Sequence, residues 1–136
     1  MIKPQLLKEN IEFIMDIDDD IKGYGVASEF KHIILNLLSN AKDSIIHNNT
    51  RIREISIIAE KTNNSMILLK VQDTGGGIPE DIINDIFDDY FTTKGKGGTG
   101  IGLSMTKLIV EEEMNGTISV CNNKDGALFS LNIPMY

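Results

Sequence analysis

The sequence predicts an α+β fold, a two-layer α/β sandwich in which helices cover one face of a mixed, mostly antiparallel sheet of about five strands. Two observations predict this class. Short segments with strand-like alternation occur in pairs that are joined by turn-rich residues, as in β-hairpins. Segments with helical periodicity separate these pairs, so the order is strand, helix, strand, strand, helix, loop, helix, strand, strand. This order is typical of a sheet with a single layer of helices, and we expect three main helices.

Length, composition and charge limit the possible classes of protein. A chain of 136 residues with 41% hydrophobic and 24% charged residues is long enough for one globular domain. The net charge of −7 argues against nucleic acid as a partner, because a phosphate-binding surface needs clustered Lys and Arg. The single cysteine, Cys121, allows no intrachain disulfide and indicates a reducing compartment. No apolar run has the length of a membrane span or a signal peptide, so we expect a soluble cytoplasmic domain.

An amphipathic helix is predicted over residues 29–47. Its apolar side chains fall on one arc, which should face the core: Phe30, Ile34, Leu37, Leu38, Ala41 and Ile45. A narrower polar line lies beside that arc and contains Asn36, Asn40, Asp43 and His47. Asparagine is a poor helix former, so two of them one turn apart in mid-helix need a reason. The helix alone leaves two explanations open, a solvated edge or a row of neutral oxygen ligands directed into a pocket.

Alternating or β-rich segments predict the strands of the sheet. They cover residues 11–17, 54–60, 66–73, 116–122 and 127–134. Polar segments at 61–65 and 123–126 join two pairs of these strands as hairpins. Pro79 is well placed as the first residue of a short helix that reaches residue 86 or 87. Helical spacing predicts one more helix over residues 100–114.

A first glycine-rich segment, Asp73-Thr-Gly-Gly-Gly-Ile-Pro79, follows a predicted strand. Glycines let the backbone approach a flat ligand closely, and an ionised Asp73 only accepts hydrogen bonds. This combination suits an exocyclic amino group such as that of adenine. The alternative is an ordinary Asp-Thr-Gly turn.

A second glycine-rich segment, residues 95–103, runs into a predicted helix. Its glycines fit the pattern G-x-G-x-x-G, but no strand precedes them and no acidic residue ends a strand about 20 residues later, so the dinucleotide fingerprint is rejected. A Walker phosphate loop lacks its Gly-Lys-Ser/Thr. Two interpretations remain, a loop that closes over phosphates or an ordinary surface loop. The aromatic residues of 86–94 could anchor such a lid or belong to the core, and Lys94 could reach a phosphate.

Taken together, these elements resemble the ATP-binding catalytic domain of bacterial sensor histidine kinases, whose superfamily includes DNA gyrase, a mismatch-repair ATPase and a heat-shock chaperone. The resemblance covers nearly the whole chain, from about residue 11 to residue 134, and rests on four motifs in the order and spacing of the family. They are an asparagine box at 36–41, a first glycine box at 73–78, a phenylalanine box at 87–94 and a second glycine box at 98–103. Each motif is weak alone, and the specificity comes from all four.

The resemblance implies the Bergerat ATP-binding fold, one catalytic domain over residues 1–136, and ATP and Mg2+ as cofactors. It implies that Asn40 coordinates the metal, that Asp73 binds the adenine amino group, and that residues 98–103 wrap around the phosphates. Asn36 and Lys94 are the implied catalytic residues. The complete set of implied nucleotide-contacting residues is Asn36, Asn40, Asp73, Gly75, Gly77, Ile78, Thr93, Lys94, Gly98, Thr99, Gly100, Ile101, Gly102 and Leu103.

Some positions depart from the family pattern. Asp43 and Ser44 stand where many members carry Lys and an aromatic residue, so a phosphate contact from residue 43 is in doubt. Asp89 replaces a frequent proline, and Ala127 replaces a frequent hydroxyl residue. The two histidines, at positions 32 and 47, lie on the asparagine helix without the acidic neighbour of a phosphoacceptor.

The chain therefore resembles a fragment of a longer sensor kinase that is separated from its dimerisation domain. The implied partners are ATP, the phosphoacceptor-histidine dimerisation domain of the same kinase, and a downstream response regulator. We expect a monomeric isolated domain and a homodimeric full-length kinase, and the membrane attachment of that kinase stays open.

Three functions remain open. The first is transfer of the γ-phosphoryl group of ATP to a histidine on a separate domain. The second is an ATP-hydrolysing or serine-kinase (anti-sigma) member of the superfamily, which carries Glu one helical turn before the magnesium Asn. Here that residue is Asn36, which cannot take a proton, and this favours the histidine kinase. The third is a nucleotide-sensing pseudokinase, and the intact Asn40, Asp73 and glycine boxes argue against it.

Overall fold

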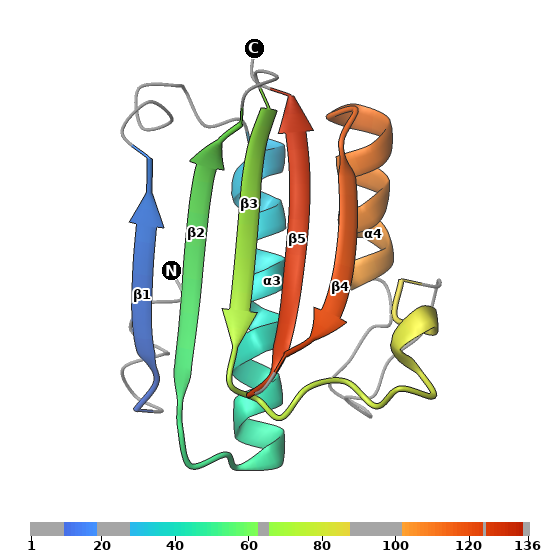
Figure 1. The fold of residues 1–136 in the computed structure, drawn as a ribbon. Helices are drawn as coiled ribbons and strands as arrows, with labels where there is room; N and C mark the ends of the chain where they lie inside the picture. Colours follow the sequence, from blue (N-terminus) through green and yellow to red (C-terminus); the bar gives the residue numbers. More distant parts are fainter. Residues whose placement is uncertain (1–9, 19–27, 63–65, 88–101, 124, 135–136) are drawn as a thin grey trace.

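The computed structural model describes residues 10–18, 28–62, 66–87, 102–123 and 125–134. These residues form one five-stranded sheet with helices packed on one of its faces (Figure 1). The elements are β1 (Glu12–Ile17), α3 (Ser28–Asn48), β2 (Glu54–Lys61), β3 (Met66–Asp73), the 3-10 helix η1 (Ile83–Asp85), α4 (Gly102–Leu108), the π-helix η3 (Ile109–Glu113), β4 (Thr117–Asn122) and β5 (Ala127–Pro134). The predicted α+β sandwich is confirmed.

The sheet has the order β1-β2-β3-β5-β4 and is mixed. β1 runs parallel to β2, and the other neighbouring pairs are antiparallel. The two predicted hairpins are β2–β3 and β4–β5, and they join where β3 pairs with β5 from Met66↔Pro134 to Gln72↔Leu128. This pairing places the end of β3 beside the start of β5, so Asp73 lies next to the turn between β4 and β5.

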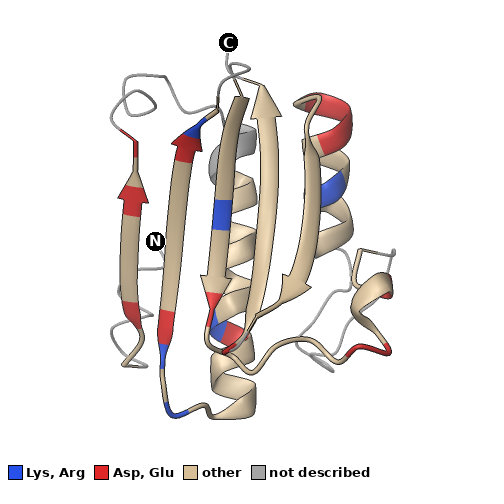
Figure 2. Cartoon of the chain, viewed as in Figure 1, with Lys and Arg blue, Asp and Glu red and all other residues tan. Residues whose placement is uncertain are grey.

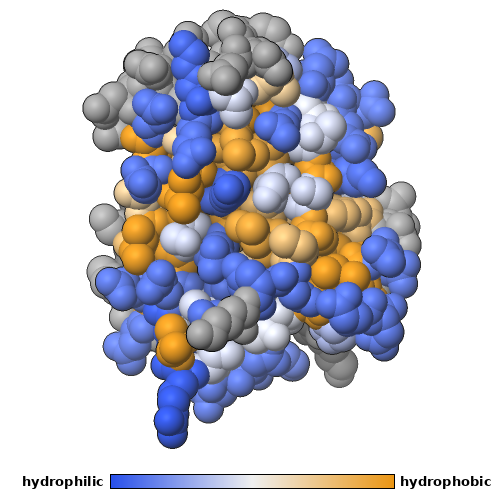
Figure 3. Space-filling model, in the orientation of Figure 1, coloured by the Kyte–Doolittle hydropathy of each residue, from blue (hydrophilic) through white to orange (hydrophobic). Residues whose placement is uncertain are grey.

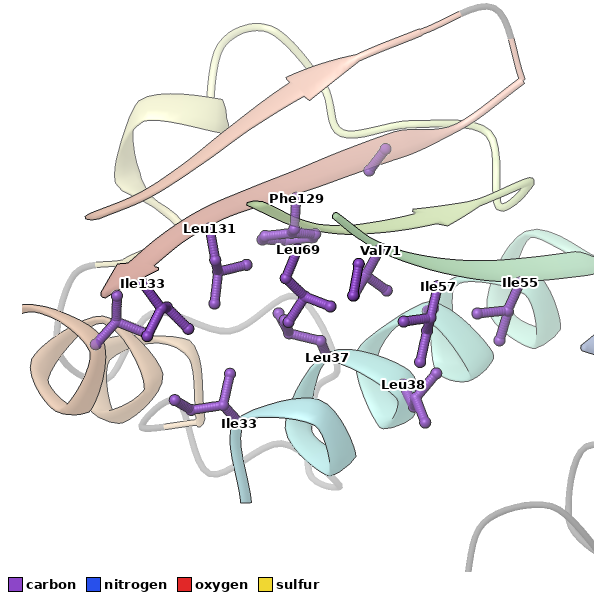
Figure 4. Close-up of a cluster of buried hydrophobic side chains, with 14 of the residues drawn as sticks. Ile33, Leu37, Leu38, Ile55, Ile57, Leu69, Val71, Phe129, Leu131 and Ile133 are labelled. Carbon is purple, nitrogen blue, oxygen red and sulfur yellow. The ribbon is translucent and has the colours of Figure 1, made fainter. Parts of the chain in front are cut away.

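The hydrophobic core lies between the sheet and α3 (Figure 4). Alternate residues of β3 and β5 are buried, as expected of strands with one covered face. Figure 4 shows Leu37 and Leu38 of α3 pointing at side chains from the sheet, among them Leu69. Burial of each large aliphatic side chain stabilises the fold by about 1.5–3 kcal/mol.

The core-facing arc of α3 is centred differently from the predicted arc. Ile33, which lies outside the predicted arc, is fully buried, whereas Ile34 is only half-buried. Figure 4 shows Ile33 on the side of Leu131 and Ile133, so β5 extends the core there in a way that periodicity within one helix cannot reveal. The other predicted core residues, Leu37, Leu38, Ala41 and Ile45, are buried. The side chain of Phe30 lies outside the described residues.

The helix predicted to start at Pro79 is shorter and tighter than expected. The Pro79 carbonyl accepts hydrogen bonds from Ile82 N and Ile83 N, each at 3.1 Å. A turn therefore begins at Pro79, but only the three-residue 3-10 helix η1 follows it. The preceding residue, Ile78, is bound to β4, as described below, and this restricts the direction in which the segment leaves the sheet.

The helix predicted over residues 100–114 begins as α4 and ends as the π-helix η3. Met114 N donates to Ile109 O at 3.0 Å, which closes the wider π turn. Val110 in this turn is fully buried in the core. Asn115, with φ of 55°, takes the left-handed conformation that commonly ends a helix.

No other described element covers the sheet face opposite the helices. The strand register places Ile58, Leu68 and Leu128 on it, and Figure 3 shows apolar patches among polar side chains on this face. Acidic residues occur near both ends of β1 and β2 and along η3 (Figure 2). Among the described helices, none has the length and apolar character needed to cross a membrane.

Candidate functional site

The candidate site is built around Asp73, the last residue of β3. Its side chain is 4% exposed, and Oδ1 accepts hydrogen bonds from Gly75 N at 2.8 Å and from Ala127 N at 3.3 Å. Ala127 begins β5, so the pairing of the two central strands fixes the carboxylate. Within the described part of the chain no hydrogen bond reaches Oδ2, which leaves this oxygen as an acceptor for a ligand.

Burial changes the acidity of Asp73. Desolvation raises the pKa of its carboxyl group above the usual value, because removal from water penalises the charged form. The backbone hydrogen bonds from Gly75 and Ala127 stabilise the anion and offset part of that rise. A buried carboxyl group with a perturbed pKa next to a glycine-rich segment is a candidate functional group.

The loop after Asp73 packs closely on the C-terminal half of α3. A Cβ at Gly75 would lie 2.8 Å from Cβ of Ser44 and 2.9 Å from its Oγ, closer than side chains pack. Asn48 Nδ2 also donates to Gly75 O at 2.6 Å. Gly75 is therefore required for close approach to the helix. The same contact leaves little room at position 44 for a side chain larger than that of Ser44.

The next residues of the loop are held by the β4–β5 hairpin. Gly76 and Gly77 have φ of 94° and 85°, a conformation that favours glycine. Gly76 N donates to Asp125 O at 3.1 Å. Asn122, the last residue of β4, accepts a hydrogen bond from Ile78 N and donates one to Ile78 O. Residues 75–78 are thus fixed by α3 on one side and by the hairpin on the other.

A ridge of small polar side chains runs along α3 from this loop. Asn36, Asn40, Ser44 and Asn48 repeat every four residues, so they lie along one ridge of the helix, about 18 Å long. One end of the ridge contacts the loop. At the other end, Asn36 Nδ2 donates at 3.3 Å to Oγ1 of Thr106, a fully buried residue of α4. The ridge therefore connects the Asp73 loop with α4.

The polar line predicted on α3 is uneven in its burial. Asn36, Asn40 and Asp43 are half-buried, whereas His47 is exposed. Ser44 and Asn48, which contact Gly75, lie outside the predicted line.

Several predicted site residues lie outside the described residues. They are Thr93, Lys94, Gly98, Thr99, Gly100 and Ile101. The rest of the segment 88–99, for which the sequence predicts a lid that becomes ordered when nucleotide binds, also lies outside the described residues. Gly102 begins α4, and Leu103 is half-buried against the core. Phe87, which starts the phenylalanine box, is packed edge-on against Phe129 with ring centroids 6.2 Å apart, and Lys107 Nζ lies 5.6 Å from its ring centroid.

Among the residues of this arrangement that were not predicted as site residues are Asn48, Asn122 and Thr106. Asn48 directly follows the helix predicted over residues 29–47, Asn122 ends a predicted strand, and Thr106 belongs to the helix predicted over residues 100–114. The partners of Asn48 and Asn122 are 27 and 44 residues away in the sequence. Local periodicity does not encode such pairs. One sequence signal could have identified Asn48 and Asn122. Each is an asparagine at the end of a helix or strand, and a side-chain amide in such a place can bind the main chain of a glycine-rich loop.

Comparisons with known proteins identify the family of this chain. The family model for histidine kinase-, DNA gyrase B-, and HSP90-like ATPases matches residues 25–136. The two-component sensor PprA of Pseudomonas aeruginosa is 35% identical over 116 residues, which is 82% of this chain and 12% of PprA. The sensor histidine kinase GlnK of Bacillus subtilis is 32% identical over 135 residues, which is 96% of this chain and 32% of GlnK.

Solved structures show the same likeness. The nucleotide-free catalytic domain of histidine kinase ThkA has a TM-score of 0.81 and 30% identity, over 98% of this chain and 86% of that domain. ThkA in complex with the response regulator protein TrrA gives a TM-score of 0.71 at 26% identity, over 99% of this chain and 37% of ThkA. The chain spans only 12% and 32% of the length of PprA and GlnK. It belongs to the family of histidine kinase-, DNA gyrase B- and HSP90-like ATPases, as an ATP-binding catalytic domain of the histidine kinase type.

Proposed function

We propose that this domain binds ATP with Mg2+ and donates the γ-phosphoryl group to a histidine on the dimerisation domain of the same sensor kinase. The observation that carries the proposal is the buried Asp73 carboxylate, in which Oδ1 is used by backbone donors and Oδ2 is left for a ligand. It lies at one end of the polar ridge on α3. In this arrangement the base binds at Asp73 and the phosphates lie toward Asn40 and Asn36.

The Asp73 end suits an adenine ring. An exocyclic amino group donates hydrogen bonds, and an ionised carboxylate only accepts them. Gly75 has no side chain to block the approach of a flat ring to the backbone. The half-buried Ile78 supplies apolar surface at the end of the loop. These features support Asp73, Gly75, Gly77 and Ile78 as contacts to the base.

The Asn40 end suits magnesium. The amide oxygen of Asn40 is a neutral oxygen ligand on a half-buried side chain, and magnesium commonly takes few protein ligands while it keeps water and phosphate oxygens. When bound there, Mg2+ neutralises charge on the phosphates. Lys94 and residues 98–103, which lie mostly outside the described residues, are proposed to contact the phosphates directly.

Asn36 favours phosphotransfer over hydrolysis. Its amide cannot accept a proton from water, and its Nδ2 already donates to Thr106. A histidine nitrogen is a good nucleophile and needs less general-base help than water does. An ATP-hydrolysing or serine-kinase member would need a carboxylate at this position. A nucleotide-sensing domain without transfer remains the other alternative.

We also propose the setting of a two-component system. The structure of ThkA with TrrA supports a response regulator as the downstream partner. Use of ATP implies a cytoplasmic location for the domain. The isolated domain would act as a monomer, and two copies would meet only through the dimerisation domain of the full-length kinase.

The experiment that tests this function uses the full-length parent kinase. With Mg2+ and γ-labelled ATP, the wild type should acquire an acid-labile, base-stable phosphohistidine, and Asp73→Asn should lose most of this label while it stays folded by circular dichroism. Release of phosphate without phosphohistidine would move the domain to the ATPase branch. Binding of ATP without either product would make it a nucleotide sensor.

A further inference from the structure

The side-chain amide of Asn122 pairs with the main chain of Ile78 as a neighbouring strand would. Oδ1 accepts from Ile78 N at 2.7 Å, and Nδ2 donates to Ile78 O at 2.6 Å. Nδ2 also lies 3.2 Å from Oε1 of Glu80. This pairing needs one acceptor and one donor on the same planar group, and asparagine provides both.

The glycine loop is shaped to make this contact. Gly77 has φ of 85°, and a Cβ at this position would lie 2.9 Å from Asn122 Oδ1. The left-handed residue and the missing side chain both bring Ile78 against the end of β4. The side-chain amide of Asn122 and the conformation of Gly77 therefore both support the contact between Asn122 and Ile78.

We propose that Asn122 is a positioning residue that holds the base-binding loop in place through the main chain of Ile78, without touching the nucleotide. The inference rests on the proposed binding of ATP at Asp73. On the opposite side, Asn48 holds the carbonyl of Gly75. Release of the Ile78 anchor lets the loop swing away from β4, so the ordering of residues 75–78 must then be supplied by the ligand, which lowers its affinity.

The test compares Asn122→Asp with Asn132→Asp, which makes the same charge change on an exposed residue of β5. A carboxylate at position 122 still accepts from Ile78 N but repels Ile78 O. We expect Asn122→Asp to lower the affinities for adenosine and for ATP by the same factor, about tenfold. The ratio of ATP affinities with and without Mg2+ should stay that of the wild type. The Asn132→Asp control should bind both ligands normally.

The pH dependence of nucleotide affinity in Asn122→Asp is a second measurement, and a purely structural role of Asn122 would not affect it. A neutral carboxyl group again has one donor and one acceptor, so the affinity loss of Asn122→Asp relative to the wild type should shrink as the pH falls. Glu80 is the carboxylic acid in contact with Asn122, at 3.2 Å, and the other acids on the segments joined at this site are Asp73, Asp81, Asp85 and Asp125. They are present in both proteins, so the ratio of affinities isolates the new group. A loss that is independent of pH would overturn the proposal.

The two proposals fail in different ways. If the wild type binds neither adenosine nor ATP, the proposed function fails. If the wild type binds and Asn122→Asp binds equally well, only the positioning role of Asn122 is overturned. Should the variant not fold, hydrogen exchange in the empty wild-type protein decides the matter. The Ile78 amide should be protected, and exchange at the rate of a free peptide would overturn the proposal.

Discussion

Asn48 Nδ2 donates a hydrogen bond of 2.6 Å to Gly75 O, and this contact joins the last residue of α3 to the loop that follows β3. One turn earlier, Ser44 lies against Gly75 so closely that no Cβ fits between them. The hydrogen bond and the packing contact together set the distance between the helix and the loop. The geometry at Asp73 therefore depends on α3 as well as on the sheet.

The first prediction concerns this distance. Gly75→Ala should destabilise the domain by about 1–3 kcal/mol, because the new Cβ would lie 2.8 Å from Ser44 Cβ and must push the loop or the helix aside. Urea unfolding followed by circular dichroism measures the change. ATP affinity should fall as well, since Asp73 moves with the loop.

The control is a double-mutant cycle with Ser44→Gly, which removes the two nearest atoms that a Cβ at residue 75 would meet and leaves only Asp73 Oδ1, at 3.1 Å. Ser44→Gly alone should cost up to about 1 kcal/mol, as glycine does inside a helix. The double variant should lose less stability than the sum of the two single changes. Additive losses in the free energy of unfolding would show that Ser44 does not limit the room for a side chain at residue 75.

The second prediction concerns recognition of the base. Asp73→Asn should weaken ATP binding by about 10- to 100-fold, because an amide can present a donor where the base also presents a donor. The fold should persist, since an amide oxygen can still accept from Gly75 N and Ala127 N. Titration of a fluorescent ATP analogue measures the affinity. An unchanged affinity in a folded variant would remove Asp73 from the site.

The third prediction concerns the pH dependence of stability. The pKa of Asp73 is raised in the folded protein by desolvation, so the charged form destabilises the fold. The stability of the wild type relative to Asp73→Asn should therefore be greatest below the ordinary pKa of Asp. It should decline as the pH rises through the raised folded pKa. Thermal unfolding of both proteins between acidic and neutral pH checks this, and a difference that does not vary with pH would contradict the raised pKa.

Much of the fold could be predicted because it is encoded locally. The alternation in β3 and β5 reports which face is covered, and the polar turn before Ala127 reports a hairpin. Ile33 was missed because its burial depends on β5, an element far away in the sequence. The helix at Pro79 was overestimated for a similar reason, since Ile78 is tied to Asn122 across 44 residues.

The candidate site divides in the same way. The position of Asp73 and its glycines at the end of a strand could be predicted from the local sequence, and their contacts with a nucleotide stay predictions. The residues that hold the loop, such as Asn48 and Asn122, could not be predicted, because each acts only through a partner that folding brings close. The role of Thr106 likewise depends on a hydrogen bond from Asn36 on another helix.

The fourth prediction concerns magnesium. Asn40→Ala should reduce the gain in ATP affinity that Mg2+ provides, and it should leave the affinity for adenosine nearly unchanged. The reason is that Asn40 lies eight residues before Asn48 on the ridge of α3, away from the Asp73 loop. Isothermal titration with ATP and adenosine, with Mg2+ or with a chelator, separates the two effects. Equal magnesium dependence in variant and wild type would exclude Asn40 as a metal ligand.

The fifth prediction concerns turnover by the domain alone. The isolated domain should bind ATP and Mg2+ but release phosphate very slowly. Asn36 occupies the position at which a hydrolytic relative carries a carboxylate, and its amide donates to Thr106 instead of taking a proton. A general base typically contributes about 10²–10⁴-fold in rate, so its absence leaves water a poor nucleophile.

Phosphate release should therefore be measured for the wild type and for Asn36→Glu, with Asn36→Gln as the neutral control of the same length. A gain of hydrolysis in Asn36→Glu alone supports the histidine-kinase assignment, because only the carboxylate can accept the proton of an attacking water. Equal gains in both variants would attribute the effect to the lost contact with Thr106 rather than to a base. Rapid turnover by the wild type that is abolished in Asn40→Ala would instead assign the domain to the ATPase branch, since water would then be its natural acceptor.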